Sequence, residues 1–171
     1  MEIAQDMSEH STVTVRELPD LASAAGGSCL VRADSLLVET TQRMELIDVT
    51  DIVAERVRRS GIREGTISLF SLHTTCALFI NEVQKALHAD ILQVLEQIVD
   101  RHGAWLHNDP KHSDCDRMNA DSHLRAMLLG HGVSLQVSGG QPVLGQYQRL
   151  LVAEMDGPRS RTIRLQTMGV P

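Results

Sequence analysis

The chain has 171 residues, a size that suits one globular domain. Its net charge of −6 comes from 16 basic and 22 acidic residues, and aromatic residues make up 2% of the sequence. This balance disfavours nucleic-acid binding, which needs clustered Lys and Arg and rings for base stacking. No run approaches the roughly 18 apolar residues of a membrane span, so no membrane partner is expected.

The three cysteines, Cys29, Cys76 and Cys115, are widely spaced and form no paired metal-binding pattern. We therefore expect reduced thiols. The first residues lack the charged region followed by an apolar region that marks a secretory signal. Together these features predict a cytoplasmic protein.

Residues 1–28 are polar and acidic and end in a run of Ala, Ser and Gly, a composition typical of a flexible arm. We assign no site to this arm and expect a single domain over residues 29–171. The domain opens with predicted strands at 29–39 and 44–49. A helix is expected next, capped by Thr50 at its start and stopped by Gly61 at its end.

The most informative stretch is residues 68–82. It begins as an apolar strand after Gly65, continues through Cys76 to Ile80 after a turn, and is interrupted by His73, Thr74 and Thr75. Polar groups inside a packed sheet cost a few kcal/mol unless they find partners. Because Asn81 and Glu82 close the stretch, we expect His73 and Glu82 to mark one wall of a site.

A helix over residues 83–101 is predicted by an apolar stripe at helical spacing. The stripe contains Leu87, Ile91, Val94, Leu95 and Ile98. Asp90 falls on its margin, about sixty degrees from its centre at ~100 degrees per residue, where a carboxylate can face solvent or a cleft.

Residues 105–118 are rich in turn formers and acids, which predicts a long polar loop of the kind that often carries function. A short helix is expected from Asn119 to Leu129. Asn119 and His123 are four residues apart, so they share one helical face and can address the same ligand.

The last third is predicted to form consecutive antiparallel strands at 133–137, 143–155 and 161–168, joined by Gly-containing turns. In the middle strand, Gln148 and Glu154 lie on the same side by two-residue alternation.

Eight histidines invite a metal hypothesis, although none stands in a His-Glu-x-x-His pattern. Neutral imidazoles of His73, His107 and His123 could converge on one divalent ion from a strand end, a loop and a helix. A second set, His112 and Cys115 with neighbouring aspartates, could also bind a metal, but a polar loop explains it equally well. The sequence contains neither a phosphate-binding GxxxxGK loop nor a GxSxG nucleophile motif.

A series of short motifs resembles the YjbQ-like family, called secondary thiamine-phosphate synthases. The motifs are His73-Thr-Thr, Asn81-Glu, Trp105-Leu-His, Asn119-Ala-Asp-Ser-His-Leu, Leu129-Gly, Leu144-Gly-Gln-Tyr-Gln and Glu154-Met-Asp-Gly-Pro-Arg-x-Arg. Their order and combination cover residues 29 to 169. The chain departs from the family pattern at residues 83–86, at Tyr147 and at residues 135–138, which affects the detailed shape of the pocket.

The resemblance implies an α+β fold in which a large antiparallel or mixed, sandwich-like sheet carries a few helices, assembled as a homotrimer. It also implies a weak transferase activity that joins a pyrimidine pyrophosphate to a thiazole phosphate and releases pyrophosphate. The expected partner is therefore a small phosphorylated molecule, and the expected cofactor is a divalent metal, zinc before magnesium or calcium.

Site residues carried over from the motifs fall into three groups. The metal ligands are His73, His107 and His123; the catalytic candidates are Glu82, Asp90, Asn119, Gln148 and Glu154; the substrate-binding candidates are Thr74, Asn81, Arg159 and Arg161. Pyrophosphate ordinarily calls for magnesium and oxygen ligands, which fits a three-histidine site poorly. Two alternatives therefore stay open: a metal-dependent hydrolase of a small ester with Glu82 as base, and a non-catalytic trimer that binds a metal or an anion.

Overall fold

The computed structural model describes residues 5–6, 12–17 and 29–171. The strands in this part of the chain are β1 (Gln5–Asp6), β2 (Thr12–Glu17), β3 (Leu30–Glu39), β4 (Glu45–Asp48), β5 (Glu64–Ser71), β6 (Cys76–Asn81), β7 (Gly132–Ser138), β8 (Gln141–Pro142), β9 (Arg149–Glu154) and β10 (Ser160–Val170). The helices are α1 (Thr50–Ser60), α2 (Lys85–Ile98), the short 3-10 helix η1 (Leu106–Asn108) and α3 (Ala120–Leu129).

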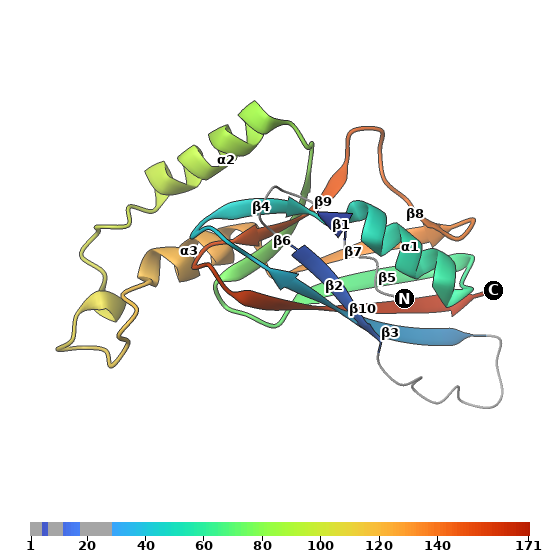
Figure 1. Cartoon of the computed structure of the whole chain (residues 1–171), viewed down its shortest axis with the longest axis horizontal. Coiled ribbons are helices and arrows are strands. Elements are labelled where there is room, and N and C mark those ends of the chain that lie inside the picture. The colour runs from blue at the N-terminus through green and yellow to red at the C-terminus, as the bar shows by residue number, and fades with distance from the viewer. Residues whose placement is uncertain (1–4, 7–11, 18–28) are drawn as a thin grey trace.

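The strands form two sheets in which every pairing between the described strands is antiparallel (Figure 1). The larger sheet has the order β1-β2-β3-β10-β5-β7-β8, and the smaller has the order β4-β9-β6. The expected single-domain α+β fold with a large, sandwich-like sheet is thus confirmed, in its antiparallel form.

Strand β9 lies at the centre of the packing because both of its faces are covered. Leu150 and Val152 point into the main core between the two sheets, while Ala153 contributes to a second core with Leu95 and Ala126 of the helices. Side chains alternate across a strand, so a strand buried on both sides needs an unbroken apolar run, as Leu-Leu-Val-Ala provides. This arrangement places the end of β9, where the polar residues begin, between both sheets and α3.

The predicted order of the C-terminal strands is wrong. β9 does not pair with its sequence neighbours but with β4 and β6, whereas β7 pairs with β5 and β8, and β10 with β3 and β5. The middle strand is also shorter than predicted, since it begins at Arg149 instead of residue 143. Apolar alternation identifies a strand, but it does not identify the partner strand.

Two parts of the predicted flexible arm form strands. β1 pairs with β2, and β2 pairs with β3 at the border of the larger sheet, where Val13 is fully buried. The predicted arm boundary at residue 28 therefore differs from the structure over these segments. The remaining residues of that predicted arm lie outside the described residues.

Helix α1 ends where the sequence predicts, but it starts one residue earlier, because Val49 and not Thr50 occupies the N-cap position. Gly61 adopts a left-handed conformation (φ 74°) just after the last turn, as expected of a helix-stopping glycine. Thr50 is the first helical residue, and its hydroxyl accepts the backbone N–H of Leu150 at 2.7 Å while donating to Asp48. These contacts fasten the helix to β9.

Helices α2 and α3 differ sharply in how they meet the rest of the molecule. α3 packs beside β6, whereas α2 projects from the body, as Figure 1 shows at its upper left. Leu95 is the one buried residue of α2, and Val94 and Ile98 of its predicted stripe are 44% and 63% exposed. Among the described helices, none is long and apolar enough to cross a lipid bilayer.

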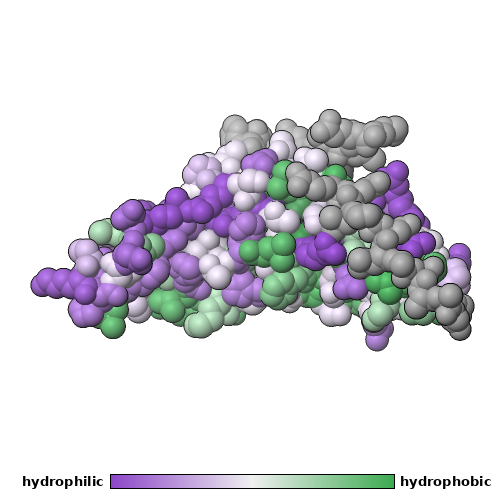
Figure 2. All heavy atoms as spheres, turned by 90° about the horizontal axis from the view of Figure 1, so that it is seen from below, coloured by the Kyte–Doolittle hydropathy of each residue, from purple (hydrophilic) through white to green (hydrophobic). Residues whose placement is uncertain are grey.

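Apolar side chains also reach the surface elsewhere. In Figure 2, hydrophobic residues are interspersed with hydrophilic ones on the face seen from below, and several gather along the lower border. The large exposed apolar residues include Leu106, Met118, Met127, Leu128 and Tyr147. Exposure of this kind is common for single residues but marks an interaction site where it forms a continuous patch.

Candidate functional site

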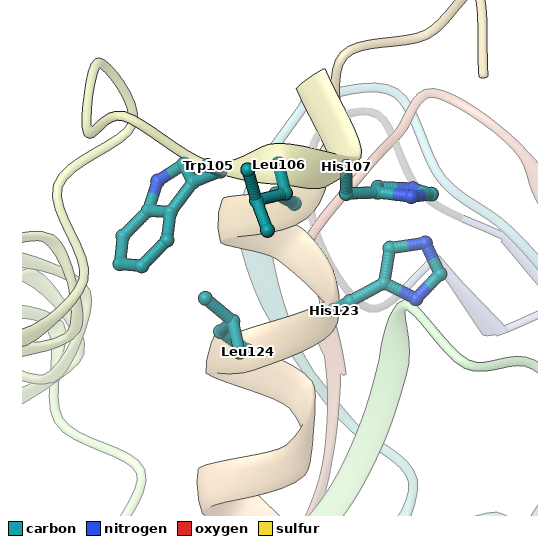
Figure 3. A pocket seen from close by; sticks show the side chains of 6 residues that line it. Trp105, Leu106, His107, His123 and Leu124 are labelled. Carbon is teal, nitrogen blue, oxygen red and sulfur yellow. The ribbon is translucent and has the colours of Figure 1, made fainter. Parts of the chain in front are cut away.

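A pocket of about 340 Å³ opens between η1 and the first half of α3 (Figure 3). Trp105, Leu106 and His107 approach from the η1 segment, and His123 and Leu124 approach from α3. The backbone N–H of Ala120 donates to the side chain of Asn108 at 3.0 Å, which holds the two segments together. The walls are largely apolar, and the two imidazoles form their polar part.

The rings of His107 and His123 contact one another edge to face, with centroids 5.1 Å apart and planes 84° from parallel (Figure 3). Burial lowers the pKa of His123, and the neighbouring His107 lowers it further, while Asp156 and Asp121 act in the opposite direction. His123 is consequently a neutral imidazole at pH 7, the form that can accept a proton or coordinate a metal.

His73 lies in the turn between β5 and β6, and its Nε2 accepts the backbone N–H of Thr162 at 2.8 Å. Burial lowers its pKa, with a further contribution from Arg161, so the ring is neutral and carries its proton on Nδ1. With Nε2 occupied and Nδ1 protonated, His73 has no free lone pair for a metal in this arrangement. Its contact instead fastens the turn to β10.

The predicted three-histidine centre is assembled only in part. His107 and His123 meet, but among the described residues no group of three or more His, Cys, Asp or Glu side chains is placed to hold a metal ion. Two imidazoles fit half of the tetrahedral set that zinc prefers. Further ligands would have to come from outside this group of side chains.

A buried ion pair joins the two sheets next to His73. Arg161 of β10 contacts both carboxylate oxygens of Glu154 at the end of β9, with 2.6 Å between Nε and Oε2. The Thr40 hydroxyl donates to Glu154 at 3.0 Å, and Arg161 donates to the Thr75 hydroxyl at 3.0 Å. Burial would lower the pKa of Arg161, but Glu154 raises it overall. Both charges are thus satisfied within the structure.

Asp156, two residues farther along, is contacted by three arginines although only 1% of it is exposed. Arg117 approaches one carboxylate oxygen at 2.9 Å and Arg159 approaches the same oxygen at 3.4 Å, while Arg43 approaches the other at 3.3 Å. Asn119 donates to the shared oxygen at 2.8 Å. Burial alone would raise the pKa of Asp156, but Arg117 and Asn119 lower it overall, so the carboxylate is ionised.

Asp121 in the first turn of α3 extends this network. It pairs with Arg125, one helical turn later, at 2.9 Å, and with Arg43 at 3.1 Å. The Ser122 hydroxyl donates to the backbone carbonyl of Met155. These contacts attach the start of α3, and with it His123, to the end of β9.

The turn after Asp156 has room for a glycine and no larger residue. A Cβ atom at Gly157 would lie 2.2 Å from the carbonyl oxygen of Gln42. The backbone N–H of Gly157 also donates to the carbonyl of Arg43 at 3.0 Å. The loop that carries Arg43 and the turn that leads to Arg159 therefore lie against each other.

Comparison with known proteins now places the chain. Residues 34–170 match the family model described as UPF0047 protein YjbQ-like. The chain belongs to this family. A UPF0047 protein of Methanothermobacter thermautotrophicus is 42% identical over 141 residues, which cover 82% of this chain and 94% of the relative. A UPF0047 protein of Archaeoglobus fulgidus is 41% identical, covering 78% of this chain and 98% of the relative.

Solved structures agree with this membership. A YbjQ-like protein of unknown function from Sulfolobus solfataricus superposes with a TM-score of 0.77 at 34% identity, covering 82% of this chain and 99% of the other. A hypothetical protein from Aeropyrum pernix gives a TM-score of 0.74 at 34% identity, covering 81% and 98%. The recognition of the YjbQ-like family from sequence motifs is thereby confirmed.

In this YjbQ-like domain the predicted site residues fall into two groups. His73, Thr74, Glu154, Arg159 and Arg161 cluster around one end of β9 and β10 together with Asn119 and the histidine pair. Thr74 is exposed in the β5–β6 turn.

The second group, Asn81, Glu82 and Gln148, lies at the opposite end of the smaller sheet. Asn81 is paired with Arg149, five residues from the Cys76–Glu154 pair, a separation of roughly 16 Å along an extended strand. Gln148 accepts the backbone N–H of Gly145 within its own turn. Asp90 is exposed on α2 and belongs to neither group. One chain therefore does not bring all twelve candidates to one point.

Four charged residues of the network around Asp156 were missing from the predicted site: Arg43, Arg117, Asp121 and Arg125. The spacing of Asp121 and Arg125 is that of a helical ion pair, so this contact could have been read from the sequence. Arg117 stands in a polar loop and Arg43 in a tight turn, and neither position carries a local signal that points to Asp156. Their roles follow from the packing of three distant segments.

Proposed function

We propose that the pocket between η1 and α3 binds a small phosphorylated molecule, and that the chain is a transferase of the secondary thiamine-phosphate synthase type. In this proposal it joins a pyrimidine pyrophosphate to a thiazole phosphate and releases pyrophosphate, as a weak activity. The observation that carries the proposal is the contact of His107 with His123 on the wall of an otherwise apolar pocket. The pocket lies next to a cluster of arginines.

The composition of the pocket wall suits a flat heterocycle. Trp105, Leu106 and Leu124 offer apolar surface, and a volume of about 340 Å³ lies at the small end of ligand pockets. An aromatic ring of the substrate can stack on the indole of Trp105, whose Nε1 is already satisfied by the carbonyl of Asp100 at 2.8 Å. The histidines then face the polar part of the bound molecule.

His123 is the residue that we assign to the chemistry. Its neutral imidazole can accept a proton from the reacting group, and His107 sits where it can orient that ring. Asn119 and Glu154 act as positioning residues: Asn119 holds Asp156 and Glu154 holds Arg161. Four predicted residues do not reach the pocket of their own chain: Glu82, Asp90, Asn81 and Gln148. They can take part only if they come from another subunit.

A divalent metal remains part of the proposal, with two histidine ligands instead of three. His107 and His123 would hold it, with zinc favoured because imidazole nitrogens suit zinc better than magnesium or calcium. His123 would then serve as a ligand instead of a base, because a neutral imidazole has one free lone pair. When bound, the ion would supply positive charge toward a phosphate oxygen. His73 is omitted from this set because its Nε2 is engaged by Thr162.

The proposal includes assembly as a homotrimer. The exposed apolar stripe of α2 supports it, because Val94 and Ile98 remain at the surface of a single chain. The separation of Asn81, Glu82 and Gln148 from the histidine pair supports it as well. In an assembly these residues of one subunit could approach the pocket of the next.

The test is pyrophosphate release from the two precursors by the wild-type chain and by the His123→Asn variant. We expect this substitution to lower the rate about 100-fold or more, the typical contribution of a positioned acid or base. His102→Asn is the matched control, because His102 is exposed. Equal rates in wild type and His123→Asn would refute the assignment.

The same preparations distinguish the alternatives. Each is assayed with added zinc and after chelation, against the precursors and against a panel of phosphate esters. Ester hydrolysis without precursor turnover would support a metal-dependent hydrolase. Binding of the precursors without any turnover would support a non-catalytic role.

A further inference from the structure

Arginines outnumber carboxylates among the ion pairs at the end of β9. Five arginines take part in them among the described residues: Arg43, Arg117, Arg125, Arg159 and Arg161. The carboxylates that they contact are three: Asp121, Glu154 and Asp156. Further acids stand nearby, since Glu45 lies opposite Glu154 in the β4–β9 pairing and Asp116 precedes Arg117. The excess of guanidinium groups is therefore specific to Asp156, which three arginines contact, and such an excess attracts anions.

The surplus is concentrated at Asp156. Arg117 and Arg159 both contact Oδ2 of Asp156, at 2.9 and 3.4 Å, so the contacting nitrogens cannot be farther apart than the sum of these distances. Guanidinium groups repel one another at such a separation, and one carboxylate cannot neutralise both together with Arg43. An additional anion would relieve the repulsion.

Arg117 is also oriented before any ligand arrives. Arg117 is held at two points, through Nε to the carboxylate and through Nη2 to the backbone carbonyl of Asp156 at 3.2 Å. The side-chain amide of Asn119 donates a hydrogen bond to the same oxygen of Asp156. Fixed guanidinium groups lose little entropy on binding, and their planar arrangement of N–H donors matches the oxygens of a phosphate.

These arginines are the most exposed of the cluster, in which the side chain of Arg43 is 28% exposed. The side chains of Arg117 and Arg159 are 50% and 36% exposed, whereas those of Arg161 and Arg125 are 2% and 1% exposed. Arg161, which the sequence pointed to as a substrate ligand, is consumed by Glu154 and Thr75. The accessible donors are therefore on Arg117 and Arg159.

We propose that the outer faces of Arg117 and Arg159, fixed by Asp156, form the binding site for a phosphate or pyrophosphate group. The site adjoins the histidine pocket, since Asp156 acts electrostatically on His123 and Asn119 lies one helical turn before it. The inference deepens the proposed function and rests on it for the identity of the larger molecule. Arg117 thereby becomes the residue that selects phosphorylated ligands.

Calorimetric titration with inorganic pyrophosphate, without metal and at an ionic strength of about 0.1 M, tests this site. We expect the affinity to fall about 10-fold or more in Arg117→Gln and in Arg159→Gln, because a hydrogen bond between charged groups is worth about one factor of ten or more. Arg58→Gln removes the same charge from the surface of α1 and serves as the matched control. Its affinity should stay within about 2-fold of wild type, as expected for a distant charge screened by salt.

The outcomes separate this site from the proposed activity. Unchanged pyrophosphate affinity in Arg117→Gln, or an equal loss in Arg58→Gln, would overturn the binding site. If Arg159→Gln does not fold, Arg117→Gln decides alone, because Arg117 is half exposed. If His123→Asn releases pyrophosphate as fast as wild type while pyrophosphate binding still depends on the arginines, the transferase proposal is refuted and the anion site stands.

Discussion

Helices α2 and α3 are neighbours in the chain, separated only by η1 and its loops, but they differ in what holds them. α3 buries Ala120, Asp121, Ser122, Arg125 and Ala126, three of them polar, whereas α2 buries Leu95 alone. The predicted apolar stripe on α2 is nonetheless the more obvious feature of the sequence. An amphipathic pattern therefore predicts that a helix forms, whereas specific polar contacts decide whether that helix packs against the rest of its own chain.

The largest expected effect concerns the attachment of α3. Replacing Asp121 by Ala leaves Arg125 buried without its charged partner, so the free energy of unfolding should fall by about 3–5 kcal/mol. Asp90→Ala on exposed α2 is the matched control and should change stability by less than about 0.5 kcal/mol. Urea denaturation measures both. Similar losses in the two variants would erase the distinction between the helices.

The next effect concerns the unpaired face of α2. The double variant Val94→Glu, Ile98→Glu adds two charges to exposed positions, so it should leave the single chain folded but prevent subunit association. Light scattering of wild type should give the mass of a trimer, and that of the variant should give the mass of one chain. A double variant that keeps the wild-type mass would show that this face is not the contact between subunits.

The smallest effect is a dependence of stability on pH, carried by both helices. Burial lowers the pKa of His123 on α3, with His107 adding to it, and burial lowers the pKa of His88 on α2. These two histidines bind protons more readily in the unfolded chain than in the folded one. The free energy of unfolding should therefore decline as the pH falls below about 6.5, the ordinary histidine pKa.

Thermal melts of wild type, His123→Gln and His88→Gln between pH 7.5 and 5 check this dependence. Each substitution should make the melting temperature less sensitive to pH, because it removes one group that takes up its proton more readily on unfolding. His102→Gln, at an exposed position, should leave the slope as in wild type. If neither His123→Gln nor His88→Gln changes the dependence of the melting temperature on pH, that dependence does not come from these two histidines.

Elements governed by local sequence could be predicted, whereas those governed by pairing could not. Gly61 ends α1 as expected because a left-handed residue is a local requirement. Strand β9 was recognised by its apolar run, but its partners β4 and β6 depend on contacts far away in the sequence. The histidine pair was found because His123 and Trp105-Leu-His107 stand in recognisable motifs.

Arg117 shows why the rest of the site escaped prediction. Its partner Asp156 is 39 residues away, and nothing in the loop sequence distinguishes it from a solvated arginine. His73 shows the opposite case: its motif suggested a metal ligand, but the backbone N–H of Thr162 occupies Nε2, the nitrogen that would bind the metal. Both cases depend on tertiary contacts that neither spacing nor periodicity contains.

Gly157 has a consequence for how this cluster tolerates change. The missing side chain lets the carbonyl of Gln42 approach, and this closeness sets the separation between the segments that bear Arg43 and Arg159. A single added methyl would act as a wedge between them. The anion binding that we propose for Arg117 and Arg159 would then be lost through a position that carries no charge.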